Sequence, residues 1–422
     1  MNYPIKIQVE KVIPEGYKLT DAGVIPEDWD ACKIGDISEI IRGASPRPKG
    51  DKRFYGGNIP RLMVEDVTRD GKYVTPSVDS LTEAGAKLSR PCSKGTLTLV
   101  CSGTVGVPSI LAVDACIHDG FLGLSKVNKS ISIDYLYHFF TTQQEKFNNS
   151  ATHGGVFTNL TTDGVKEFLL ALPRDKKEQT AIANVLSDID ALITELEKLI
   201  AKKQAIKTAT MQQLLTGRTR LPQFSKHPNG IIKGYKPGEL GHIPEDWEER
   251  EIGKFAPLQR GFDLPASKRN EGLYPVVYSN GIVNTHNHFQ VKGPGVVTGR
   301  SGTLGKVHHI ECDFWPHNTS LWVTKFINSD PKFVYYIFKY IGFERFASGS
   351  GVPTLNRNDA HSFKVAIPSS LKEQIIIATI FSDMDTELEA LEQKLAKVRD
   401  IKQGMMQQLL TGRIRLPLDQ QP

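Results

Sequence analysis

Cysteine is scarce in this sequence, and long apolar runs are missing from it. The 422 residues include five cysteines, and no two of them stand in a CxxC arrangement. An odd number of cysteines without metal-ligand spacing argues against a disulfide framework or a zinc ribbon and favours a reducing cytoplasm. No apolar run reaches the roughly 18 residues of a membrane span, and the N-terminal MNYPIKIQVEK lacks the apolar stretch of a signal peptide. The composition therefore predicts a soluble cytoplasmic protein with no membrane segment.

Motifs that carry catalysis are also missing. The sequence has no GxGxxG cofactor loop, no Walker A loop and no (Asn/Asp)-Pro-Pro-(Tyr/Phe) motif of adenine methyltransferases. Cys116 and His118 form a lone CxH pair, which is too small a set to predict a metal site. We therefore expect no catalytic residue, no metal and no cofactor in this chain.

What the chain does have is enough apolar sequence for packed cores and a mild basic excess. Hydrophobic residues make up 39%, and 52 basic against 47 acidic residues leave a net charge of +5. This balance excludes general disorder. It permits a nucleic-acid partner but does not require one.

Two sets of motifs recur in the same order. GYKLTDAGVIPEDWDACKIGDISEIIRG from Gly16 returns without a gap as GYKPGELGHIPEDWEEREIGKFAPLQRG from Gly234. LPRDKKEQTAIANVLSDID matches IPSSLKEQIIIATIFSDMD, and MQQLLTGRTRLP matches MQQLLTGRIRLP. The segments between these motifs differ far more. The alternative is an old duplication that simply drifted, but drift would have changed the helix sequences as well. Similar flanking motifs around divergent middles therefore indicate two domains that act on different targets.

Each middle contains short apolar runs broken by glycine and proline, and then an aromatic-rich helical stretch. These features predict an α+β protein in which two tandem α/β domains are each followed by a long helix. The predicted parts are an N-terminal segment 1–24, a first domain 25–175, a first helix 176–220, a linker 221–242, a second domain 243–370, a second helix 371–415 and a tail 416–422.

Glycine-rich loops stand at matching places in the two middles. SGTVG (102–106) and SGTLG (301–305) each follow a predicted strand, and no helix start follows them. A phosphate-binding P-loop needs GxxxxGK(S/T) leading into a helix, so tight turns are favoured over phosphate sites. GGVFTNL from Gly154 and SGVPTLN from Ser350 are placed similarly, and both interpretations stay open for them.

The two long helices carry the strongest periodic signal. Apolar residues recur in alternating steps of three and four without an intervening proline, which is the period of a coiled-coil seam. The predicted seam residues are Ile182, Val185, Ile189, Leu192, Leu196 and Leu199 in the first helix, and Phe381, Met384, Leu388, Leu391, Leu395 and Val398 in the second.

Charge selects the direction in which these helices pair. Each helix is acidic in its first half and basic in its second half. An antiparallel pair sets acidic against basic residues, whereas a parallel pair sets like charges together. We expect a pseudo-twofold antiparallel coiled coil with one domain at each end, although a solvated charged face would also explain the charges.

With both sets of motifs in place, the chain resembles the specificity subunit of type I restriction–modification systems from about Gly16 onward. The resemblance rests on the repeated IPEDW, P-x-x-x-x-EQ-x-x-I and LLTGR motifs around two divergent middles. It implies two target-recognition domains that read an asymmetric, bipartite site in double-stranded DNA, with the helices as a ruler for the unread spacer. It further implies two modification subunits that hold S-adenosylmethionine and methylate adenine at N6, docked mainly on the helices. Restriction subunits would add ATP- and magnesium-dependent translocation and cleavage.

Base readout needs forked donors, and phosphates accept any cation. Two basic, glycine- and proline-rich loops supply such side chains, as does the arginine before the second SGT loop. The candidate DNA-binding residues are Arg42, Arg47, Lys49, Lys52, Arg53, Arg260, Lys268, Arg269 and Arg300. A stand-alone nuclease or methyltransferase lacks its catalytic residues here, and a protein-binding scaffold would not explain two basic, divergent domains.

Overall fold

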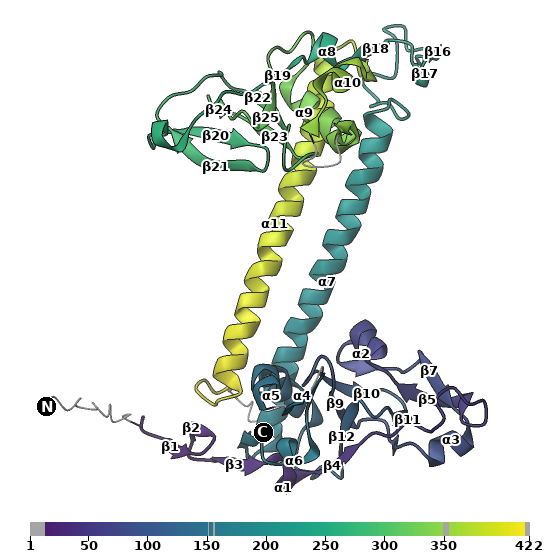
Figure 1. Cartoon of the computed structure of the whole chain (residues 1–422), viewed down its shortest axis with the longest axis vertical. Helices are drawn as coiled ribbons and strands as arrows, with labels where there is room; N and C mark the ends of the chain where they lie inside the picture. The colour runs from purple at the N-terminus through teal and green to yellow at the C-terminus, as the bar shows by residue number, and fades with distance from the viewer. Residues whose placement is uncertain (1–12, 151, 155–156, 349–353, 418–422) are drawn as a thin grey trace, which may run out of the picture. The chain divides into compact units, whose positions relative to one another are not determined.

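The computed structural model describes residues 13–150, 152–154, 157–348 and 354–417. The chain forms two compact units, residues 1–195 with 395–422 and residues 196–394 (Figure 1). The long helices α7 (Lys176–Leu214) and α11 (Leu371–Leu409) each contribute one stretch to either unit.

The first unit is built on two β-sheets. The larger sheet contains, in spatial order, β4 (Glu39–Arg42), β12 (Phe121–Ser125), β9 (Leu97–Val100), β10 (Pro108–Leu111) and β6 (Tyr73–Val74). The smaller sheet contains β7 (Asp79–Leu81), β5 (Tyr55–Leu62), β11 (Ala115–Ile117) and β8 (Pro91–Cys92). Three two-stranded pairs complete the strands: β1 (Tyr17–Thr20) with β2 (Gly23–Pro26), β3 (Trp29–Lys33) with β15 (Leu169–Pro173), and β13 (Thr152–Gly154) with β14 (Phe157–Asn159).

Six short helices accompany these strands. They are α1 (Ile34–Ile37), α2 (Val64–Asp70), α3 (Glu83–Lys87), α4 (Ile133–Thr142), α5 (Gln144–Ser150) and α6 (Thr162–Lys166). IPRLMVEDV from Ile59, one of the short apolar runs that we interpret as strands, forms the end of β5 and then α2. The Asp66 carboxylate accepts a hydrogen bond from the Met63 N–H at 3.0 Å. This bond satisfies one of the backbone N–H groups that have no partner within the helix, so the chain leaves the strand and starts α2 at this point.

The second unit has the same plan with fewer strands. One sheet contains β19 (Leu258–Arg260), β25 (Ser320–Val323), β22 (Gly295–Gly299) and β23 (Val307–Ile310), and another contains β21 (Gly281–His286), β20 (Tyr274–Tyr278) and β24 (Trp315–Pro316). The pairs are β16 (Tyr235–Gly238) with β17 (Gly241–Pro244), β18 (Trp247–Glu251) with β28 (Lys364–Pro368), and β26 (Ala347–Ser348) with β27 (Thr354–Leu355). The helices are α8 (Ile252–Phe255), η1 (Ala266–Lys268), α9 (Pro331–Ile341), η2 (Phe343–Phe346) and α10 (Arg357–Ser362).

The aromatic-rich helices α4 and α9 are core elements, as their spacing predicts. Ser132 and Asp330 cap them by accepting the N–H groups of Tyr135 and Phe333, at 3.3 and 2.8 Å. Most of their aromatic rings belong to the two main cores; the buried ones are Tyr135, Phe139 and Phe140 of α4 and Phe333, Tyr336 and Phe338 of α9, whereas Tyr340 of α9 is 40% exposed. The buried rings therefore stabilise the fold.

Each core is completed by the end of one long helix and the start of the other. In the first unit, Met406, Leu409 and Leu410 of the α11 end pack with Ile182 and Leu186 of the α7 start. In the second unit, Leu214 and Leu215 pack with Ile377, Ala378 and Phe381. The predicted antiparallel pairing is therefore confirmed within each unit.

Ion pairs follow the predicted direction as well. Lys402 contacts Asp190 at 2.5 Å in the first unit, and Lys203 contacts Glu387 at 2.6 Å in the second. Lys207 pairs with Asp385, the sequence equivalents of Lys402 and Asp190. The basic half of each helix therefore meets the acidic half of the other.

The row of α7 that faces inward differs in part from the predicted seam. Leu192 and Leu199 are 43% and 38% exposed, whereas Leu186 is fully buried and Ile193 and Ile200 are half-buried. Two parallel rows of apolar residues lie on this helix, and their common period does not reveal which row faces the partner. The inward row also contains the buried Lys207, which a search for apolar residues passes over.

The remaining predicted seam positions lie inward to different degrees. Ile182, Leu196, Phe381 and Leu388 are buried. The half-buried positions are Val185, Ile189, Met384, Leu391, Leu395 and Val398. The row on α11 thus lies on the inward face along its whole predicted length.

Candidate nucleic-acid interface

In the first unit, the basic loop after β4 folds onto the turn between β11 and β12. The Gly43 N–H donates to the Phe121 carbonyl at 2.9 Å, and the Ala44 N–H donates to the Ile117 carbonyl at 3.2 Å. A β-carbon on Gly43 would lie 2.0 Å from the His118 carbonyl oxygen, so only glycine permits this approach. The turn and the loop, far apart in sequence, therefore form one surface.

A cavity of about 160 Å³ lies where this loop meets the turn. It is lined by Ser45, Arg47, Lys49, Tyr55, Arg61, His118 and Asp119. Arg61 is 2% exposed, donates to Asp79 from Nε at 3.0 Å and to Ser45 Oγ at 3.2 Å, and lies 5.0 Å from the centre of the Tyr55 ring. The Tyr55 hydroxyl donates to the Pro46 carbonyl at 2.7 Å and closes the loop on itself. The cavity wall is thus held by buried polar contacts.

Asp119 and His118 form a pair at the mouth of this cavity. The His118 Nε2 lies 2.8 Å from Asp119 Oδ1, and the Ser45 hydroxyl donates to the same oxygen at 2.9 Å. Burial lowers the pKa of His118, which favours the neutral imidazole. Burial alone would raise the pKa of Asp119, but Ser45, His118 and Arg47 together lower it, so the carboxylate is ionised near neutral pH.

The second unit repeats this geometry with different side chains. The Gly261 N–H donates to the Ser320 carbonyl at 3.0 Å, and a β-carbon on Gly261 would lie 2.2 Å from the His317 carbonyl oxygen. His317 therefore corresponds to His118, and Asn318 to Asp119. The His317 ring lies 4.2 Å from the Tyr278 ring, centre to centre, and the Asn318 amide donates to Asp263.

The SGT loops are tight turns beside these surfaces. Their glycines Gly103, Gly106, Gly302 and Gly305 all have φ between +77° and +84°. The strands β10 and β23 follow the loops, so no helix N-terminus is present to bind phosphate. In the second unit, the N–H groups of Arg300 and Ser301 donate to the Thr319 carbonyl at 2.9 and 3.1 Å. The predicted loops from Gly154 and Ser350 lie partly outside the described residues.

Two of the five predicted cations of the first unit line the cavity, and a third contacts the turn beside it. Arg47 and Lys49 line it, and Arg42 Nε donates to the Asp119 carbonyl at 3.3 Å. Arg53 instead binds Asp51 through two nitrogens and covers the Phe54 ring. Lys52 is exposed and forms no ion pair with the residues that the structure describes.

In the second unit, three of the four predicted cations lie around the turn from His317 to Thr319. Arg260 ends β19 and is 3.5 Å from Asp263, and Arg300 is held against Thr319. Arg269 donates to the Tyr278 hydroxyl at 3.3 Å. Lys268 lies on η1 and is exposed.

The candidate residues chosen from the sequence are all cations, so they do not include the neutral and acidic side chains of the two turns. His118, Asp119, His317 and Asn318 stand in the related triplets HDG and HNT, each directly after a short strand. Cys116, the partner of His118 in the CxH pair, is buried in an apolar cluster. Across the described residues, no three His, Cys, Asp or Glu side chains come close enough to hold a metal ion.

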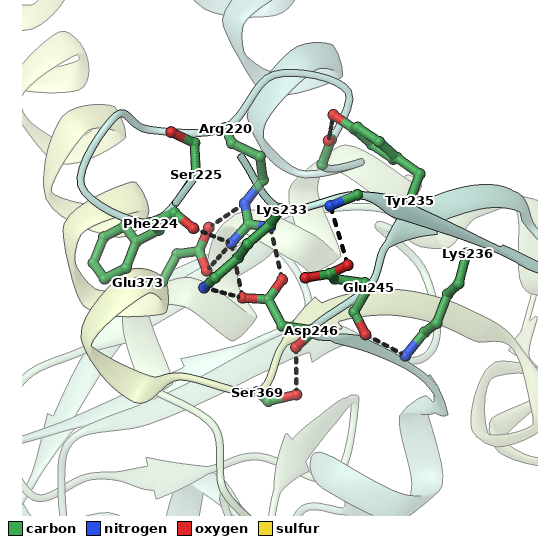
Figure 2. Close-up of polar contacts among 12 residues, drawn as sticks. Arg220, Phe224, Ser225, Lys233, Tyr235, Lys236, Glu245, Asp246, Ser369 and Glu373 are labelled. Atoms are coloured by element: carbon green, nitrogen blue, oxygen red, sulfur yellow. Dashed lines mark hydrogen bonds and ion pairs between the residues drawn. The ribbon is translucent and has the colours of Figure 1, made fainter. Parts of the chain in front are cut away.

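The repeated sequence motifs form a separate, structural cluster in each unit. Figure 2 shows it in the second unit, where Arg220 donates to both Glu373 and Asp246, and Lys233 also contacts Asp246. The Arg220 guanidinium lies 5.7 Å from the centre of the buried Trp247 ring. The MQQLLTGRTRLP, IPEDW and KEQ motifs therefore meet at one point.

The same cluster recurs in the first unit with residues from both ends of the described chain. Arg415 contacts Glu178 and Asp28, and its guanidinium lies 5.8 Å from the centre of the Trp29 ring. The Tyr17 hydroxyl donates to the Gly412 carbonyl at 3.0 Å, as Tyr235 does to Gly217 in the second unit. The exit motif of the second repeat thus closes the first unit.

No helix within the described parts of the chain is both long and apolar enough to cross a bilayer.

Two α/β units with equivalent basic loop surfaces, on a shared antiparallel helix pair, define a class of duplicated recognition proteins. A family profile described as the type I restriction modification DNA specificity domain matches residues 26–208 and 244–399. The chain therefore belongs to the family of type I restriction–modification specificity subunits.

Individual relatives agree with this assignment. The putative type I restriction enzyme MjaX specificity subunit of Methanocaldococcus jannaschii is 25% identical over 95% of this chain and 97% of its own length. The MjaIX specificity subunit of the same organism is 27% identical, but that match spans 59% of this chain and 56% of the relative, little more than half of its length. The crystal structure of a type I restriction–modification S subunit from M. genitalium has the same fold, with a TM-score of 0.61 at 17% identity over 93% of this chain and 97% of that one.

Proposed function

We propose that this chain reads a bipartite, asymmetric sequence in double-stranded DNA and directs a type I restriction–modification complex to it. Each unit reads one half-site in the major groove through the loop surface described above. The observation that carries the proposal is the recurrence of one loop geometry with different side chains, His118 and Asp119 in one unit against His317 and Asn318 in the other. An equivalent frame with different donors and acceptors is what two different half-sites require.

Catalysis in this proposal belongs to the partner subunits. Two modification subunits bind S-adenosylmethionine and methylate adenine at N6, and restriction subunits use ATP and magnesium to translocate and cut. A solved structure described as the structural basis of complex assembly and conformational transition of the type I R-M system has a TM-score of 0.52 to this chain at 13% identity, over 92% of this chain and 99% of that one. This shared fold supports a role within such an assembly, which we place in the cytoplasm.

The proposal is tested with the purified full chain, alone and with its modification subunits. Retention of duplex DNA on nitrocellulose measures binding, and transfer of a labelled methyl group measures catalysis. We expect the complex to bind and methylate DNA, and the chain alone to transfer no methyl group and to cut nothing. Methyl transfer by the isolated chain, with contamination excluded, would contradict the division of roles. Absence of any DNA binding by the complex would contradict the proposal as a whole.

A further inference from the structure

One oxygen of the Asp119 carboxylate is engaged and the other is available. Oδ1 accepts from the Ser45 hydroxyl and faces His118 Nε2 at 2.8 Å. Oδ2 lies 3.8 Å from an Arg47 nitrogen and accepts no hydrogen bond from the residues that the structure describes. A carboxylate has about four lone-pair sites, so Oδ2 presents a strong acceptor at the cavity mouth.

The neighbours of Asp119 hold this acceptor in place. The Gly120 N–H donates to His118 Nδ1 at 2.9 Å and fixes the ring, whose Nε2 lies 2.8 Å from Asp119 Oδ1. Ser45, which donates to Oδ1, is itself bonded to the buried Arg61, which Asp79 anchors. The carboxylate is therefore oriented by the Ser45 hydroxyl and the adjacent imidazole before any ligand arrives.

Arg47 places a forked donor beside this acceptor. Its side chain is 74% exposed, so apart from the 3.8 Å approach to Asp119 it is open to solvent. In the major groove, cytosine presents the N4 amino donor, and its paired guanine presents the adjacent acceptors O6 and N7. The donor N4 and the acceptor O6 are about 2.9 Å apart, because they share a hydrogen bond. An acceptor next to a forked donor matches this order of groups.

We propose that Asp119 and Arg47 read one C·G pair of the first half-site, with Asp119 Oδ2 accepting from cytosine N4 and Arg47 donating to guanine O6 and N7. An A·T pair fits less well, because thymine offers a single acceptor followed by a methyl group. In the second unit the equivalent residue is Asn318, whose amide donates to Asp263, so that surface selects a different base. This inference rests on the proposed function and assigns it to one pair of residues.

Asp119→Asn is the discriminating substitution. The asparagine oxygen can still accept from the Ser45 hydroxyl in the place of Oδ1, while the free acceptor Oδ2 becomes an amide donor. Asp163→Asn is the matched control, because this carboxylate is 86% exposed in the same unit and pairs with Lys166 on α6. Arg47→Ala tests the second partner and removes only an exposed side chain.

The experiment selects bound duplexes from a randomised pool with the complete chain assembled with its modification subunits. For wild type we expect a C·G pair in the first half-site. Asp119→Asn and Arg47→Ala should each lower the preference for that same pair by about 5- to 150-fold and leave the second half-site unchanged. Asp163→Asn should select the wild-type sequence.

Three results would overturn the inference: an unchanged site for Asp119→Asn, equal loss of binding to all sequences, or effects of the two variants at different base pairs. If Asp119→Asn fails to fold, Arg47→Ala decides, and an unchanged site for that variant also overturns the inference. A wild-type complex that binds DNA but selects no sequence would instead contradict the proposed function, and this inference with it.

Discussion

Arg220, just beyond the end of α7, and Glu373, in the first turn of α11, form a two-contact ion pair in the second unit. The distances from Arg220 Nε to Glu373 Oε1 and from Arg220 Nη2 to Glu373 Oε2 are both 2.9 Å. The Arg220 side chain is 7% exposed and that of Glu373 is 2% exposed. Arg415 and Glu178 make the equivalent pair in the first unit. The pair ties the end of one long helix to the start of the other beside a buried tryptophan, so it belongs to the repeated structural frame of the two units.

Arg220→Met should lower the free energy of unfolding by about 3–5 kcal/mol, because it leaves the Glu373 carboxylate buried without its partner. The double variant Arg220→Met/Glu373→Leu should recover much of this loss, since no unpaired charge then remains at Glu373. Chemical denaturation checks both, with Arg218→Met as the exposed neighbouring control. A single variant as stable as the control would contradict the structural role of the pair.

We expect the free energy of unfolding to fall in acid as Asp246 becomes protonated. Burial alone would raise its pKa, but hydrogen bonds from Arg220 and Lys233 lower it from 3.8 to about 2. The folded state therefore holds the proton less tightly than the unfolded state, and the contribution of Asp246 is complete above about pH 4 and is lost as the pH falls toward 2. The difference in unfolding free energy between wild type and Asp246→Asn should be constant above this range and shrink within it. Asp359→Asn, an exposed carboxylate of the same unit, should show no such change, and a difference that grew in acid would reverse the assignment.

The exposed loop lysines should behave as phosphate contacts. Lys49→Ala and Lys52→Ala are expected to weaken binding to all sequences alike and to reduce the salt dependence by about one unit per lost contact. Arg42→Ala and Arg260→Ala should instead cost roughly 1–3 kcal/mol and relax a single base position, if their guanidinium groups bind guanine. Arg53→Ala is a useful comparison, because Asp51 already holds that guanidinium. Binding measured over a salt series separates these classes, and unchanged binding in the four variants would place the reading surface elsewhere.

Exchange of residues 25–172 for the same region of a relative should change one half-site and leave the other intact. The reading surface of the first unit, including Arg47 and Asp119, lies wholly within this segment, whereas His317 and Asn318 lie outside it. Sequencing of modified adenines in a host that carries the chimaera provides the measurement. A change in both half-sites would show that the units do not read independently.

The long helices should set the spacing between the half-sites. Four added residues lengthen a helix by about 6 Å and turn it slightly more than once, so the inward row is nearly kept. Six ångströms is close to two base-pair steps of about 3.4 Å. Duplication of Glu195–Lys198 together with Leu391–Lys394, both at the boundary of the two units, should therefore lengthen the unread spacer by one or two base pairs. Original spacing or a changed half-site in a methylome of this variant would refute the ruler.

Much of the frame could be predicted from the sequence alone. The duplicated motifs indicated two α/β domains, the period of 3.5 indicated long paired helices, and the acidic-to-basic order indicated their antiparallel direction. These features are local or periodic, so each is present in the order of residues. Period did not decide which row of α7 faces inward, because Leu192 and Leu199 are as apolar as Leu186 and Ile193. That choice depends on the partner helix and on the domain packed against it.

The proposed reading surface, which includes Arg47 and Asp119 in the first unit, was decided by the tertiary structure. Arg47 and Asp119 lie 72 residues apart in sequence, and nothing in either segment predicts the other. The close approach of Gly43 to the His118 carbonyl brings them together. In the second unit, the equivalent approach of Gly261 to the His317 carbonyl brings the corresponding loop and turn together. The composition of the loops could suggest which cationic side chains contact DNA. An acceptor becomes part of the surface only when strand pairing sets its turn beside the basic loop.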